Sequence, residues 1–134
     1  MQKIINVSGT RKRAIARATV RDGKGIIRIN NQLINNIQPE ISRLRLEEPM
    51  MLAGDHAKKI NIDIKVSGGG SQSQIEASRL AIGRAIYLHS NKNPQIKKDF
   101  IDYDRHLLIA DSRTNEASKP NDSKPRRARQ KSYR

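Results

Sequence analysis

Residues 59–90 constrain the fold of this chain more than any other stretch. They open with β-branched residues that alternate with polar ones: Ile60, Ile62, Ile64 and Val66. This period-two alternation is typical of a strand with one buried face. Three glycines follow, and residues 71–90 then place apolar side chains at helical spacing on one face. The stretch therefore predicts a strand, a glycine turn and a helix in direct succession.

The glycine turn, Gly68, Gly69 and Gly70, has two interpretations. Glycine adopts positive φ and lets a backbone or a phosphate approach closely, and the start of a helix attracts anions. We therefore expect at least one of the three glycines to have positive φ or to lie against a phosphate. The simpler interpretation is a tight connection in which Ser71 or Ser73 caps the helix. No Lys-Ser or Lys-Thr pair follows the glycines and no GxGxxG pattern is present, which excludes a P-loop and a dinucleotide site.

The net charge of +14 is concentrated at the two ends of the chain. Residues 1–29 carry a net +7 and residues 112–134 a net +6, whereas residues 30–111 carry only +1. Such basic ends indicate a polyanionic partner, and neither has the apolar face that a membrane-surface helix needs. One Phe, three Tyr and no Trp argue for phosphate contacts rather than base stacking.

A second alternating run carries part of this charge. Residues 14–20 place Ala14, Ala16, Ala18 and Val20 on one side. Arg13, Arg17 and Arg21 fall on the other side, roughly 13 Å from one to the next in a strand. The pattern predicts a cationic stripe on an outward sheet face, although a merely solvated strand face has the same pattern.

The remaining segments complete a fold of the α+β class. We expect a strand near residues 4–7, a hairpin turn at 22–25 into a strand at 26–29, and a turn at Asn30-Asn31. A helix is expected at 37–48, with Pro39 in its first turn and Ile41, Leu44 and Leu46 on its apolar side. Pro49 breaks this helix or starts a short one that ends at Gly54.

Near the end of the chain, Asn93-Pro94 predicts a short helix to residue 100, and residues 105–110 predict a last strand. These elements predict a two-layer α/β domain over residues 1–111, with helices on one face of a small mixed sheet. Residues 112–134 contain too few apolar side chains for a core, so we expect an extended basic tail.

Catalytic and metal chemistry find no support in the sequence. The chain has no cysteine, and its three histidines lie far apart, which argues against zinc. Asp102 and Asp104 are close enough in sequence to share a metal, but loop carboxylates of this kind are common. We therefore expect no enzyme activity, no metal and no cofactor.

Three blocks of sequence carry a family resemblance. They are Gly9–Ala14, the glycine turn with Ser73-Gln74 and Ala77-x-Arg79, and the ending Gln130–Arg134. In this order and spacing they resemble the ribosomal protein S-nine family of the small subunit, in its archaeal and eukaryotic branch, over essentially the whole chain. The resemblance implies a fold like the second domain of ribosomal protein S-five, with a left-handed βαβ crossover.

The resemblance also implies a function in translation, in the cytoplasmic ribosome. The chain would bind ribosomal RNA and neighbouring proteins in the head of the small subunit. Its tail would approach the anticodon stem-loop of the peptidyl-site tRNA. No membrane or small-molecule substrate is implied.

The residues expected to contact RNA lie in the three blocks, on the cationic stripe and along the tail. Those expected to bind ribosomal RNA are Arg11, Lys12, Arg13, Arg17, Arg21, Gly68, Gly69, Gly70, Arg79, Arg113, Lys119, Lys124, Arg126, Arg127 and Arg129. Those expected to contact tRNA are Lys131, Ser132, Tyr133 and Arg134.

Two other classes of protein share some of these features. One is a free-standing nucleic-acid-binding module or RNA chaperone, which has the same charge pattern. The other is an enzyme that binds phosphate at the glycine turn, against which the absence of a lysine after Gly70 argues.

Overall fold

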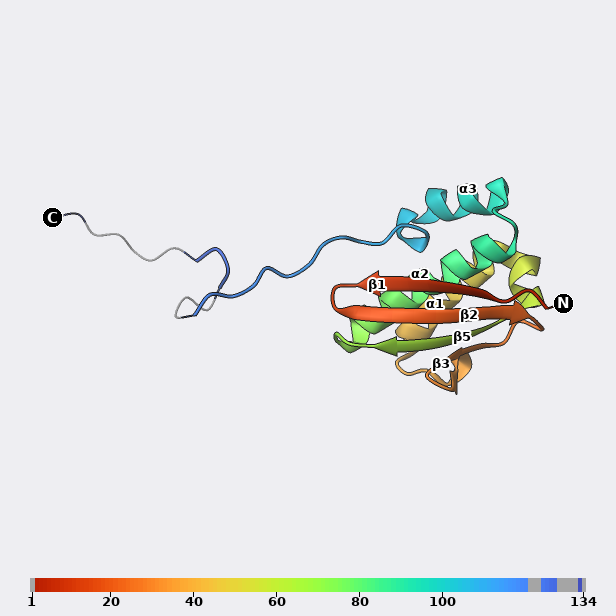
Figure 1. The fold of residues 1–134 in the computed structure, drawn as a ribbon, viewed down its shortest axis with the longest axis horizontal. Helices are drawn as coiled ribbons and strands as arrows, with labels where there is room; N and C mark the ends of the chain where they lie inside the picture. The colour runs from red at the N-terminus through yellow and green to blue at the C-terminus, as the bar shows by residue number, and fades with distance from the viewer. Residues whose placement is uncertain (1, 121–123, 128–132, 134) are drawn as a thin grey trace.

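A five-stranded mixed sheet forms one layer of the molecule, and helices cover one face of it (Figure 1). The structure is a computed structural model that describes residues 2–120, 124–127 and 133. The strands are β1 (Ile5–Arg11), β2 (Ala14–Asp22), β3 (Ile27–Ile29), β4 (Gln32–Leu33) and β5 (Ile60–Ser67). The helices are α1 (Glu40–Ala53), α2 (Ser71–His89) and α3 (Pro94–Tyr103), with short 3-10 turns η1 (Ile34–Asn36), η2 (Gly54–Lys59) and η3 (Arg105–Leu107). The predicted two-layer α+β fold is confirmed.

The predicted strand–glycine–helix unit occupies the centre of this fold. The strand order is β1-β2-β5-β3-β4, so β5 lies between β2, which is antiparallel to it, and β3, which is parallel to it. Helix α2 follows the glycine turn and packs across β1, β2 and β5. One element near the middle of the chain therefore organises most of the sheet.

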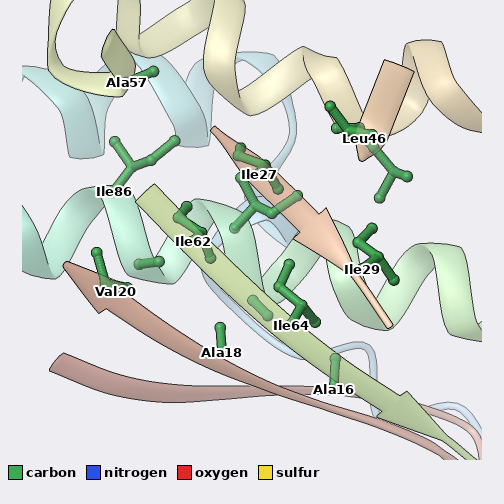
Figure 2. Close-up of a cluster of buried hydrophobic side chains, with 14 of the residues drawn as sticks. Ala16, Ala18, Val20, Ile27, Ile29, Leu46, Ala57, Ile62, Ile64 and Ile86 are labelled. Carbon is green, nitrogen blue, oxygen red and sulfur yellow. The ribbon is translucent and has the colours of Figure 1, made fainter. Parts of the chain in front are cut away.

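The core consists of small and aliphatic side chains on the inner face of the sheet. Figure 2 shows the alanines and Val20 of β2 beside the isoleucines of β5 and β3, beneath Leu46 of α1 and Ile86 of α2. The small residues let α2 approach closely, since a Cβ on Gly9 of β1 would lie 2.3 Å from the Ala77 carbonyl oxygen. The alternation predicted for residues 14–20 is confirmed, with the apolar residues buried.

The hairpin predicted at residues 22–25 is wrong. β2 and β3 do not pair, because β5 inserts between them. The connecting segment instead bonds to β5: the Gly23 and Gly25 amides donate to the Lys59 and Ile60 carbonyls, at 2.9 Å each. The segment with these glycines crosses the start of β5, a strand that lies far along the chain.

Helix α1 differs from its prediction in its bounds and in its buried face. Pro39 precedes the helix as its N-cap residue, and the helix continues through Pro49 to Ala53. The Pro49 ring is fully buried, so its packing offsets the hydrogen bond that the proline removes. Ile41 and Leu44 are 68% and 46% exposed, because the helix turns Ser42, Leu46, Pro49 and Ala53 toward the core.

The last strand predicted for residues 105–110 is also wrong. This segment begins as η3, where the Asp104 carboxylate accepts from the His106 amide, and it leads to an isolated bridge between Arg11 and Asp111. The buried Leu107 lies against Gly83 of α2, where a Cβ would come 2.2 Å from the Leu107 carbonyl oxygen. Packing against α2 therefore decides the conformation of this segment, although its apolar composition predicts a strand.

The predicted cap of α3 and the predicted turn at Asn30-Asn31 are confirmed. The Asn93 side chain accepts from the Gln95 amide and caps α3, with Pro94 in the first turn. Asn30 and Asn31, with φ of 50° and 66°, form the turn between β3 and β4. Within the described residues, no helix has the length and apolar composition to cross a bilayer.

Candidate nucleic-acid interface

The glycine turn lies against the turn that joins β1 to β2. Gly68 and Gly69 have φ of 78° and 64°, which confirms the prediction of positive φ. A Cβ on Gly68 would lie 2.5 Å from the Arg13 carbonyl oxygen, whereas a Cβ on Gly70 would meet nothing within 4 Å. The first two glycines thus permit close packing between two turns, and the third leaves its surroundings open.

The start of α2 is exposed beside this turn. Gly70 is the N-cap residue and no side chain caps the helix, so the cap by Ser71 or Ser73 in the simpler interpretation is wrong. The reason is that the helix already begins at Ser71. Its first amide groups, together with the helix dipole, favour an anion at this position.

The cationic stripe is present on the face of the sheet opposite the helices. Lys12 and Arg13 form the exposed turn before β2, and Arg17 and Arg21 extend outward from β2. In the part of the chain that the structure describes, none of these four residues forms an ion pair. Their charges are therefore available to a partner.

The structure adds Lys65 of β5 to this set. Lys65 is exposed and stands directly opposite Arg17 in the β2–β5 register. Like charges at opposed positions destabilise an antiparallel pair. The alternation of residues 60–66 already places Lys65 on the polar face, which is the sequence signal for it. We call Lys12, Arg13, Arg17, Arg21 and Lys65 the cationic surface; Asp63 is an acid on the same face of β5.

Arg79, which we expected to contact RNA, lies inside the molecule. Its side chain is 3% exposed, and its guanidinium donates to Glu48 at 2.6 Å and to Asp104 at 3.1 Å. Burial alone would lower the pKa of Arg79, but the bonds to the two carboxylates outweigh burial and raise it. Since these carboxylates occupy the guanidinium, we leave Arg79 out of the interface. Asp104 is likewise engaged by Arg79, and the described residues contain no cluster suited to a metal.

The tail residues differ in their surroundings. Arg113 and Arg126 form ion pairs with Asp111 and Glu116, and Arg11 also reaches Asp111. Lys119, Lys124, Arg127 and Tyr133 are exposed. Arg129, Lys131, Ser132 and Arg134 lie outside the described residues.

These features define a class of protein, a small basic α+β domain. Among its described residues, it presents cations without ion pairs on the outward face of its sheet and an open helix start at one end of that sheet. Such a surface suits a phosphate backbone.

Comparison with known proteins specifies the family. Residues 9–134 match the family described as ribosomal protein S9/S16. Over 134 residues the chain is 44% identical to the small ribosomal subunit protein uS9 of Methanococcus maripaludis, and the alignment covers 98% of this chain and 99% of the relative. It is 43% identical, with the same coverage, to the protein of that name from Methanococcus vannielii.

The chain therefore belongs to the ribosomal protein S9/S16 family, a family of small-subunit ribosomal proteins. It is a structural constituent of the cytoplasmic ribosome rather than an enzyme.

Proposed function

We propose that the chain binds small-subunit ribosomal RNA in the head of the subunit, with the cationic surface facing the RNA. The observation that carries this proposal is the Arg17–Lys65 pair, two like charges opposed across β2 and β5 with no carboxylate bound to either within the described residues. Such a pair costs stability in the free protein. A phosphate bound between the two cations attracts both of them and so offsets their mutual repulsion.

The neighbouring turns extend the same interface. Lys12 and Arg13 lie beside the glycine turn, and the exposed start of α2 offers backbone amide donors there. Contacts of this kind recognise the position and shape of phosphates rather than base sequence. This mode of binding suits a protein with one site in a folded RNA.

The salt dependence of RNA binding tests the proposal. Replacing Arg17, Arg21 and Lys65 by Gln is expected to reduce the slope of log affinity against log salt by about 2, because each neutralised phosphate contributes ~0.7–0.9 to that slope. The matched control replaces Arg43, Arg45 and Lys58 by Gln, which removes the same charge from residues that pair with carboxylates. Equal changes of slope in the two folded variants would contradict the proposal.

We further propose that the tail reaches the anticodon stem-loop of the peptidyl-site tRNA. In support, the tail leaves the domain at the end of β1, beside the turn that carries Lys12 and Arg13 (Figure 1). Contacts to phosphates would accept every tRNA alike. Replacing Lys131 and Arg134 by Gln keeps the length of the tail and should speed tRNA dissociation from the subunit. Rates equal to those of the unchanged chain would remove the tRNA role.

A further inference from the structure

The segment that leads into the tail is bonded to the domain through Arg84 of α2. The Arg84 Nε donates to the Leu108 carbonyl and its Nη1 donates to the Ser8 carbonyl, both at 2.9 Å. One side chain thus connects the exit segment to strand β1. The chain is consequently held close to the sheet edge just before the tail begins.

Three residues continue this connection at the start of the tail. The Arg11 Nη1 donates to the Arg113 carbonyl at 3.0 Å, and its Nη2 lies 3.7 Å from the Asp111 carboxylate. The Arg113 guanidinium binds the same carboxylate through Nε and Nη2, at 3.0 and 2.6 Å, and its backbone amide donates to it at 3.1 Å. A carboxylate held by a two-pronged guanidinium and a backbone amide has a well-defined orientation.

The low exposure of Asp111 and Arg11 separates this arrangement from an ordinary surface ion pair, although the Arg113 side chain is 79% exposed. The Asp111 side chain is 11% exposed and that of Arg11 is 19% exposed, whereas residues 112–120 are all exposed. The Arg11–Arg113 bond also joins residues 102 positions apart. It therefore connects the tail to the last residue of β1 rather than to its own neighbours.

We propose that Arg11, Asp111 and Arg113 form an exit clasp that fixes the direction in which the tail leaves the domain. The inference rests on the proposed function, since it assigns the clasp the task of aiming the tail along the RNA that the cationic surface binds. Fixing the first residues of a segment before it binds reduces the ordering cost of the complex. Arg11 and Arg113 are thus positioning residues. The N–H groups of their guanidinium groups that the clasp does not use can still donate to a phosphate.

Backbone order in the free full-length chain tests the clasp directly. We expect NMR order parameters of about 0.8 for the amides of residues 112–114, falling below about 0.6 in Asp111→Asn. Glu116→Gln removes the same charge from an ion pair farther along the tail, and it should leave these order parameters unchanged. Low order in the unchanged chain, or equal order in Asp111→Asn, would overturn the clasp.

A second variant separates position from charge. Arg11→Lys keeps the positive charge but cannot bond the Arg113 carbonyl and the Asp111 carboxylate with one rigid fork. We expect lower order at residues 112–114 in this variant as well. If order is unchanged, Arg11 acts through its charge alone and has no positioning role.

The aim of the tail is measured on assembled subunits. Because the chain has no cysteine, Asn115→Cys provides a single attachment site for an iron chelate that cleaves nearby RNA. We expect a compact set of cleavages, and a broader set when Asp111→Asn is added but not when Glu116→Gln is added. Identical patterns in all three proteins would overturn the aiming role. An absence of cleavage in all three would instead overturn the contact between tail and RNA, while the order parameters still report on the clasp.

Discussion

The two layers of this protein use arginine for opposite purposes. In the helix layer, Arg79 is buried and holds Glu48 of α1 and Asp104 before η3. On the outward face of the sheet, Arg17 is exposed and faces Lys65 without a carboxylate bound to it among the described residues. The residue type is the same, so its partners decide whether an arginine holds the fold together or remains available to RNA.

The largest expected effect distinguishes these two arginines by stability. Arg79→Ala removes a buried guanidinium and leaves two partly buried carboxylates without their shared cation, so we expect the free energy of unfolding to fall by about 3 kcal/mol. Arg17→Ala should change it by less than about 0.5 kcal/mol. Urea unfolding of the full chain, followed by circular dichroism, measures both. Similar losses in the two variants would invalidate the comparison.

A smaller effect is expected at the glycine turn, which shapes the open end of the sheet. Gly68→Ala places a Cβ at positive φ and against the Arg13 carbonyl, so we expect a loss of about 1–3 kcal/mol. Gly70→Ala is the matched control, since a Cβ there meets nothing and φ is −94°. The same unfolding measurement applies, and a loss at Gly70 as large as that at Gly68 would contradict the assigned geometry.

The smallest expected effect concerns acid. Burial alone would raise the pKa of Asp104, but the His106 amide and the Arg79 guanidinium outweigh burial and lower it below the ordinary 3.8. A carboxyl whose pKa is lower in the folded state stabilises the fold above the ordinary pKa, and this contribution is lost as the pH falls through the folded value.

The free energy of unfolding should therefore decrease below about pH 4, and less steeply in Asp104→Asn than in the unchanged chain. Asp102→Asn, a change of equal charge at an exposed position, should keep the original slope. Parallel curves for Asp104→Asn and the unchanged chain would show that the paired cluster contributes nothing to acid sensitivity.

Much of the candidate site was accessible from the sequence because it depends on local patterns. Alternation in residues 14–20 is sufficient to place Arg17 and Arg21 outward, and three glycines in succession are sufficient to predict positive φ. Lys65 follows from the same alternation in β5. Arg79 could not be placed in this way, because its two carboxylates come from α1 and from the segment before η3, far away in the chain.

By itself, the sequence determined the central strand–turn–helix unit, the cap of α3, the alternating faces of β2 and the concentration of charge at both ends. Each depends on a period or a turn chemistry within a few residues. Tertiary structure alone decided that β5 separates β2 from β3, that α1 continues through Pro49, and that residues 105–110 form a turn rather than a strand. These outcomes depend on contacts between segments far apart in the chain, where packing and pairing with a distant partner outweigh local preference.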